Sequence, residues 1–156
     1  MRSSYGVLDA EIIFAQKRTT YQKASLFKRF LNWSIDSMTI LNLSIFVEIS
    51  MGIFFVLMGK QAWVDLLSMD AINFILGWIL IFPYYFFCEY YLGGKTLGKF
   101  STKTKVRTIS GEAILAKDIF YRSALRLIPF EPLSIFFGKK CGWHDRYSRT
   151  MVVEDL

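Results

Sequence analysis

The chain has 156 residues, of which 53% are hydrophobic and 17% aromatic, and its mean hydropathy is +0.33. This length suits one domain. A net charge of +6 would suggest a nucleic-acid partner in a soluble protein, but long apolar runs favour the membrane surface as the explanation, because membrane-flanking segments concentrate Lys and Arg. Cys88 and Cys141 lie far apart and there is one histidine, which excludes a disulfide framework and an ordinary zinc site. We therefore expect no nucleic acid, metal or cofactor.

The first 25 residues are polar and basic. They lack the pattern of a signal peptide, since the first apolar run is too long and begins too late for one. Lys and Arg accumulate on the cytoplasmic side of membrane proteins. Residues 1–25 are therefore expected to form a basic cytoplasmic N-terminal segment.

A long apolar segment, about residues 26–57, predicts the first membrane-spanning helix. After Arg29, its only charged residues are Asp36 and Glu48. A mainly apolar run of this kind is typical of a span, and a carboxylate inside a span is costly and by default a functional-site hypothesis. Arg29 precedes Asp36 by about two helical turns, so the two side chains are expected to face the same way.

Residues 71–92 predict a second span. This segment has no charge between Asp70 and Glu89, and it contains Pro83. The loop between the two predicted helices is short, so the helices are expected to form an antiparallel hairpin. That arrangement returns Glu89 to the membrane side of Arg29 and Asp36.

A basic, glycine-containing segment follows the second predicted span. Gly94-Lys95-Thr96 resembles the end of a phosphate-binding loop, but such a loop needs glycine where this chain has Glu89, so nucleotide binding is not expected. Lys and Arg side chains that directly follow the end of a membrane helix commonly contact lipid headgroups. The predicted headgroup contacts are Lys95, Lys99, Lys103, Lys105 and Arg107.

Residues 100–115 predict a small cytoplasmic β-hairpin. The alternating segment 103–109 is followed by Ser110-Gly111, a turn signal, and then by a second short apolar run. Residues 151–153 are β-branched or apolar and could add a further strand.

The apolar segment at about 118–137 is interrupted. Asp118, Arg122 and Arg126 recur every fourth residue and share a helical face, whereas Pro129 and Pro132 break the pattern. A third span would also place the basic residues of 139–149 outside, against the usual charge distribution. We expect a proline-broken interfacial or re-entrant helix, with both termini cytoplasmic.

Near the C-terminus, His144, Asp145 and Arg146 are consecutive. A Ser-His-Asp hydrolase is not indicated, because the histidine and aspartate are adjacent and no nucleophile elbow is recognisable. The alternative is a polar cap or ion-pair corner at the membrane surface. We expect no enzymatic activity.

Four of these features occur in an order typical of one family. Arg29 begins the first predicted span and Asp36 lies seven residues later. A Gly-x-Thr-Leu-Gly-Lys segment at 94–99 follows the second span, and residues 144–146 precede a short predicted strand. Over about residues 24–154 the chain resembles the RDD family of small, mostly bacterial, integral membrane proteins, named for one arginine and two aspartates. The resemblance implies that these are Arg29, Asp36 and Asp145. It also implies transport of unidentified ligands, or ion/proton antiport.

The sequence thus predicts an all-α membrane protein. Its membrane domain, residues 26–154, is expected to contain an antiparallel transmembrane helix hairpin, a proline-broken interfacial or re-entrant helix and a small cytoplasmic β-hairpin. It is expected to lie in the plasma membrane, the inner membrane of a bacterium, with a charge cluster on the cytoplasmic side. The predicted members are Arg29, Asp36, Glu89, Arg122, Arg126, His144, Asp145 and Arg146.

The role of Asp36 has two interpretations. Paired with Arg29 or Arg126, it docks the cytoplasmic part on the helices. Without a full partner, it carries a proton or coordinates a cation. Three functions follow: a small transporter or transporter subunit, homo-oligomeric because two helices enclose no pore; an accessory subunit of a larger membrane complex; or an anionic-lipid-binding protein.

Overall fold

The structure is a computed structural model that describes residues 21–110, 113–131, 134 and 142–155. Residues 1–20 lie outside the described part, so the predicted N-terminal segment is described only from Tyr21. The elements are α2 (Leu26–Leu57), α3 (Gln61–Leu67), α4 (Asp70–Tyr91), α5 (Leu97–Ser101), β1 (Thr104–Thr108), α6 (Ala116–Leu125), α7 (Trp143–Tyr147) and β2 (Thr150–Glu154).

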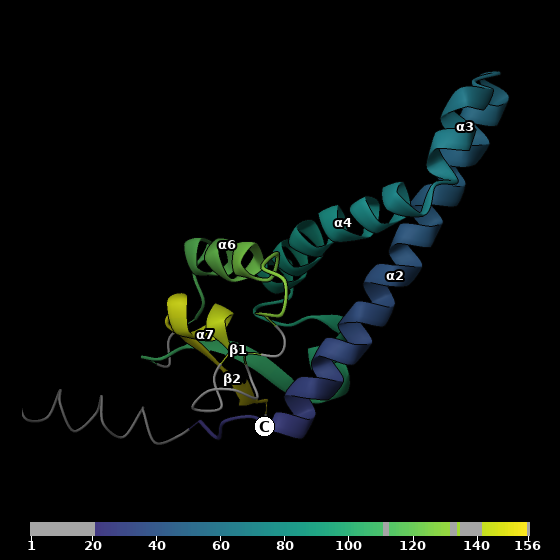
Figure 1. Cartoon of the computed structure of the whole chain (residues 1–156). Coiled ribbons are helices and arrows are strands. Elements are labelled where there is room, and N and C mark those ends of the chain that lie inside the picture. Colours follow the sequence, from purple (N-terminus) through teal and green to yellow (C-terminus); the bar gives the residue numbers. More distant parts are fainter. Residues whose placement is uncertain (1–20, 111–112, 132–133, 135–141, 156) are drawn as a thin grey trace, which may run out of the picture.

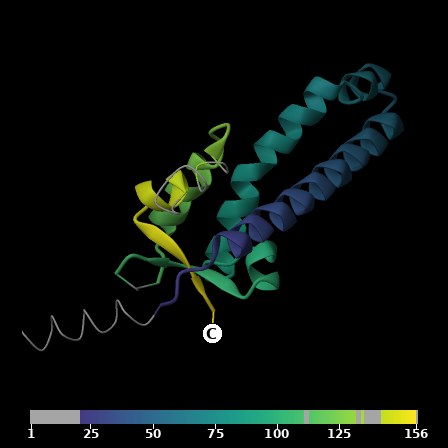
Figure 2. The ribbon, with the colours of Figure 1, turned by 60° about the horizontal axis from the view of Figure 1, so that its bottom comes forward.

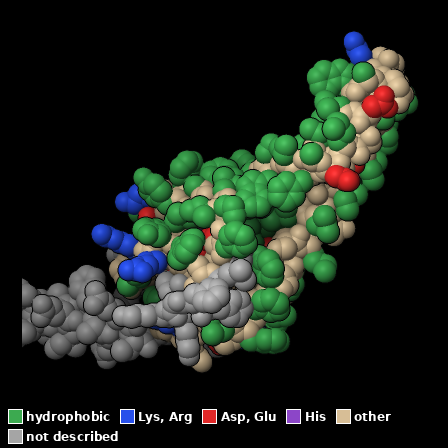
Figure 3. Space-filling view, in the orientation of Figure 1, with side chains coloured by type: hydrophobic (Ala, Val, Ile, Leu, Met, Phe, Trp, Pro, Cys, Tyr) green, Lys and Arg blue, Asp and Glu red, His purple; other side chains and the backbone are tan. Residues whose placement is uncertain are grey.

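The two long helices, α2 and α4, form the predicted hairpin, with α3 at its far tip (Figure 1). They have 32 and 22 residues and are long and apolar enough to cross a membrane. Only 6% and 11% of their most apolar stretches are buried, whereas a core helix of a soluble protein would be mostly buried. In Figure 3, hydrophobic side chains gather along the helices and the visible Lys and Arg lie towards the two ends of the molecule. This surface suits the lipid interior.

The remaining elements, α5, β1, α6, α7 and β2, gather at one end of the hairpin and are called the cap (Figure 2). β1 and β2 form a two-stranded antiparallel sheet in which Val106 pairs with Val152 and Thr108 with Thr150. Val106 and Val153 are almost completely buried. Burial of these β-branched side chains holds two segments together that are more than 40 residues apart in the sequence.

The predicted hairpin within 100–115 is wrong. The partner of β1 is β2, and residues 113–115 adopt no strand. Leu115 instead forms the N-cap of α6, and its backbone N–H donates to Asp118 Oδ2 at 3.3 Å. Pairing with the C-terminal strand buries Val106 against valines that a local hairpin lacks, and this long-range gain outweighs the local turn signal.

The third predicted apolar segment begins as helix α6, which ends at Leu125, before Pro129. Its ten residues are about half the number that a span needs. Phe120 packs edge-on against Phe82 of α4, with ring centroids 5.4 Å apart, and Ile119 is buried. Part of the segment, residues 132–133 and 135–137, lies outside the described chain.

The cap contacts the hairpin most closely where α5 crosses α2. A Cβ atom added to Gly98 would clash with the backbone of Asn32. The side-chain amide of Asn32 hydrogen-bonds to Thr102 and Thr104 beside this crossing. Only glycine permits the backbones to approach this closely.

Replacing Gly98 with alanine is therefore expected to force α5 away from α2. We expect Gly98→Ala to destabilise the protein by about 1–3 kcal/mol, the usual cost of overpacking, measured by unfolding in detergent. Gly52→Ala is the matched control, because Gly52 is also helical and a Cβ there meets nothing within 4 Å. Equal stability of the two variants would contradict this close approach.

Candidate functional site

A network of buried charged side chains lies between the cap and the adjoining ends of α2 and α4. Its side chains come from α2, α4, α5, α6, α7 and the segment after α6, and their exposed fractions range from 0% to 11%. Four are cationic and four are anionic, so their charges balance when the histidine is neutral. The charge network consists of Arg29, Asp36, Glu89, Lys99, Arg122, Arg126, Glu131, His144 and Asp145.

Arg122, on α6, connects the candidate span α4 to α7 and β2. Its Nε donates to Glu89 at 3.1 Å and its Nη1 to Asp145 at 2.5 Å. Nη1 also donates to the Thr150 hydroxyl. All three charged groups are completely buried, so each ion needs the other two to offset its lost hydration.

Glu89, near the end of α4, contacts three cationic side chains. Lys99 from α5 donates to Oε1 at 2.6 Å, Arg122 donates to Oε2, and Arg126 lies 3.6 Å from Oε1. Lys99 is only 2% exposed. The single carboxylate of Glu89 therefore ties α5 and α6 to α4.

Asp145, on α7, binds cations from both ends of the chain. Arg29 of α2 contacts Oδ2, while Arg122 and the Nε2 atom of His144 contact Oδ1. Burial would raise the pKa of Asp145, but the charges of His144, Arg122 and Arg29 hold that pKa well below its usual range. These contacts attach α7 to the first turn of α2.

Asp36 is satisfied differently, by neutral donors. Its oxygens accept hydrogen bonds from the Tyr84 hydroxyl at 2.8 Å, the Thr96 hydroxyl at 2.7 Å and the Gly98 backbone N–H at 2.8 Å. Within the described residues, the Lys and Arg side chains within 4 Å of a buried carboxylate bind Glu89 or Asp145, not Asp36. The predicted pairing of Asp36 with Arg29 or Arg126 is therefore wrong, although Asp36 does dock the cap on the helices.

His144 lies between two carboxylates. Its Nδ1 atom faces Glu131 Oε1 and its Nε2 atom lies 3.3 Å from Asp145 Oδ1. A ring with a carboxylate at each nitrogen can donate to both only as the imidazolium. Burial would raise the pKa of Glu131, but the hydrogen bond and charge of His144 outweigh burial and lower that pKa to about 2. The three side chains therefore form one hydrogen-bonded group that joins α7 to the segment after α6.

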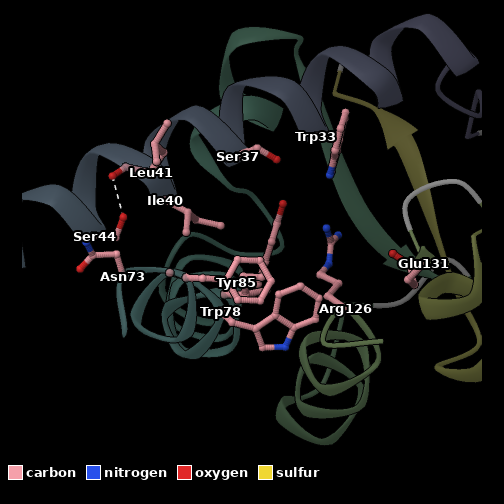
Figure 4. A pocket seen from close by; sticks show the side chains of 13 residues that line it. Trp33, Ser37, Ile40, Leu41, Ser44, Asn73, Trp78, Tyr85, Arg126 and Glu131 are labelled. Carbon is pink, nitrogen blue, oxygen red and sulfur yellow. Dashed lines mark hydrogen bonds between the residues drawn. The ribbon is translucent and has the colours of Figure 1, made fainter. Parts of the chain in front are cut away.

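Two cavities adjoin the network. The inner one, about 30 Å³, is polar and is lined by Arg29, Asp36, Lys99, Arg126, Glu131 and His144 together with Asn32, Trp33 and Val152. The larger one, about 310 Å³, lies between α2 and α4, and Arg126 and Glu131 line one end of it (Figure 4). Trp33, Arg126 and Glu131 line both cavities.

The structure brings together most of the residues predicted for the charge cluster. Arg146 is the exception, because its side chain is exposed, and its assignment to the cluster is wrong. The other seven lie in the network: Arg29, Asp36, Glu89, Arg122, Arg126, His144 and Asp145. Among the described residues, no group of histidine, cysteine and carboxylate side chains is arranged to hold a metal.

The predicted headgroup cations divide into three kinds. Lys99 is buried against Glu89, so its prediction as a headgroup contact is wrong. Lys95 and Lys105 both pair with Asp155, and their hydrogen bonds lower the pKa of Asp155 to about 2. Lys103 is exposed and Arg107 half-buried.

Sequence reasoning missed several residues of the site. In the sequence, Glu131 lies between Pro129 and Pro132 and Tyr84 lies within the second predicted span, and neither position indicates a buried partner. Thr96 and Gly98 belong to the Gly-x-Thr-Leu-Gly-Lys segment, and the structure gives that segment a physical meaning. Thr96 caps α5 and binds Asp36, Gly98 allows close packing and donates its N–H, and Lys99 neutralises Glu89. The Gly-x-Thr-Leu-Gly-Lys motif is therefore the sequence signal that could have indicated these three site residues.

Comparison with protein families gives one match, to the RDD family over residues 23–149. The chain belongs to the RDD family. This match spans all elements from α2 to α7 and therefore the whole charge network. Neither the curated proteins nor the solved structures compared with the chain gave a match. For this RDD protein, the family and the buried charges establish a membrane protein with two candidate spans.

Removing Arg122 is expected to separate the cap from α4. Arg122→Gln leaves Glu89 and Asp145 buried with one partner fewer each, and breaking such a buried pair costs about 3–5 kcal/mol. Unfolding in detergent measures the loss. Lys28→Gln is the control, since the Lys28–Glu154 pair is partly exposed and is worth at most about 1 kcal/mol. Similar losses in both variants would argue against the connecting role of Arg122.

Acid is expected to loosen the cap by protonating Glu131. The pKa of Glu131 is lowered from 4.5 to about 2, so its stabilising contribution is complete above the unfolded value and is lost as the pH falls through the folded value. The unfolding temperature should stay level down to about pH 5 and then fall towards pH 2. The unfolding temperature of the Glu131→Gln variant should fall less steeply over the same pH range. A parallel decline of both proteins would contradict this assignment.

Proposed function

We propose that this RDD protein is a non-catalytic transporter subunit that handles a proton or small ion in its inner polar cavity. The chain is a membrane protein with two candidate spans and buried charges, which supports a role inside the bilayer. Ionisable groups buried at membrane depth commonly mark ion or proton pathways. The charge network includes three ionisable side chains that lie on the candidate spans themselves, Arg29, Asp36 and Glu89.

One observation carries the proposal: the His144 ring faces the inner cavity with a carboxylate at each of its nitrogens. The imidazolium form, which donates to both carboxylates, adds one positive charge to a network whose other charges balance. The inner cavity of about 30 Å³ exceeds the roughly 10–15 Å³ that one water needs. A water or a small cation therefore fits beside the His144 ring.

A complete pathway requires more than one copy. Two spans enclose no pore, and most of their apolar surface is exposed in the single chain. We therefore propose a homo-oligomer whose copies meet through α2 and α4. The distribution of Lys and Arg supports placing the cap and both termini on the cytoplasmic side of the plasma membrane.

An accessory role in a larger membrane complex is the second candidate. Asn42 supports it, because this amide is exposed in the middle of the apolar helix α2 and polar side chains in spans often contact partner helices. Under this alternative, the chain reconstituted alone would transport nothing.

Flux measurements in proteoliposomes test the transport proposal. We expect pH-gradient-driven proton or Na⁺ flux that falls to the level of empty vesicles in Glu131→Gln and Asp36→Asn, since both carboxylates line the inner cavity. Asparagine at position 36 can still accept from Tyr84 and Gly98. Glu48→Gln is the control, an acidic residue of α2 that does not line either cavity.

Gel filtration and unfolding temperatures establish that the variants are folded. Absence of flux in the wild-type chain, or unchanged flux in both cavity variants, would refute transport through this site.

A further inference from the structure

We propose that the larger cavity binds one phospholipid, with an acyl chain between α2 and α4 and the phosphate on Arg126. This cavity is distinct from the polar cavity invoked for transport, although Trp33, Arg126 and Glu131 line both. It also differs from the surface cations of residues 95–107. Figure 4 shows the two helices facing each other across the space, with Arg126 at one end.

The walls of this cavity suit an acyl chain. They are formed mainly by apolar and aromatic side chains of the two spans, including Ile40, Leu41, Phe74, Trp78 and Ile81. Along α2 the lining runs from Trp33 to Ser44, about 16 Å at 1.5 Å per residue. One leaflet of a bilayer core is about 15 Å thick. The cavity therefore spans the depth of one acyl chain.

Arg126 supplies the headgroup contact because its hydrogen-bonding capacity is unused. Its Nε atom is buried without a hydrogen-bond partner among the described residues. Its Nη2 atom lies 3.6 Å from Glu89, beyond hydrogen-bond length, and its guanidinium stacks 3.8 Å from the Tyr85 ring. Arg122, one turn earlier, donates to three acceptors. A guanidinium with free donors matches a phosphate.

The surroundings of Arg126 favour an interfacial headgroup. In Figure 4 the indole nitrogen of Trp33 lies on the side of the ring that faces the guanidinium of Arg126. Tryptophan at such a position prefers the boundary between headgroups and hydrocarbon. Glu131 also lines this end, but its Oε1 atom accepts from the ring and backbone of His144. Arg126 is thus the group that an incoming phosphate can bind.

A phospholipid matches this space better than a partner helix does. The space has apolar walls and one cationic end, and the apolar face of a helix brings no anion to that end. A phospholipid brings an acyl chain to the walls and a phosphate to the guanidinium. The apolar walls and the single cationic end therefore select a lipid over a second copy of the chain.

Lipid retention tests the proposal. The full chain is reconstituted in nanodiscs of phosphatidylglycerol and phosphatidylcholine, extracted into mild detergent and examined by native mass spectrometry. We expect the wild type to retain one phospholipid per chain and Arg126→Gln to retain none. Lys117→Gln, which removes an exposed cation from α6, should retain it.

A second pair of variants keeps the test decisive even if Arg126→Gln fails to fold. Gly77 lines the cavity and Gly52 does not, yet both are helical and a Cβ at either meets nothing within 4 Å. Gly77→Leu should fill the cavity and lose the lipid, whereas Gly52→Leu should keep it.

Equal retention in the two glycine variants, no lipid on the wild type, or a bound peptide in its place would overturn the proposal. The flux measurement on the wild-type chain gives a second readout. Flux without retained lipid refutes only the lipid site, and retained lipid without flux refutes only the transport proposal.

Discussion

Arg122 is completely buried, and a guanidinium there is tolerated only if its charge and donors are matched. Glu89 and Asp145 provide the match, and they come from helices that are far apart in the sequence, α4 and α7. Because a lone buried charge is far costlier than a paired one, α4, α6 and α7 can be placed in few ways relative to one another. The rest of the cap follows from this contact, since β2 continues from α7 and pairs with β1.

The buried carboxylates of the hairpin use two kinds of partner. Glu89 is neutralised by cations, whereas Asp36 is stabilised by two hydroxyls and a backbone N–H. The second arrangement depends on close approach, which Gly98 allows. A short segment between α4 and β1 therefore serves both acids at once, and this explains why threonine, glycine and lysine occur together in it. Charge alone would not have required the glycine.

The network also separates two different environments. On one side is a small polar cavity lined by acids, bases and an imidazole, and on the other a larger apolar space between the spans. Arg126 and Glu131 belong to both. Events at one cavity can therefore be felt at the other through these two side chains, which gives a physical route by which the proposed lipid and the proposed ion could influence each other.

Local patterns in the sequence determined the helical hairpin. Continuous hydropathy predicted α2 at residues 26–57, as observed, and α4 within one residue, because a span is defined by its own composition. Long-range contacts decided the rest. The turn signal at Ser110-Gly111 predicted the wrong strand partner, Lys99 was assigned to the surface, and Glu131 was missed. Strand pairing and the choice between solvent and a buried partner depend on residues distant in sequence, and a buried ion is stable only where the fold supplies its counter-charge.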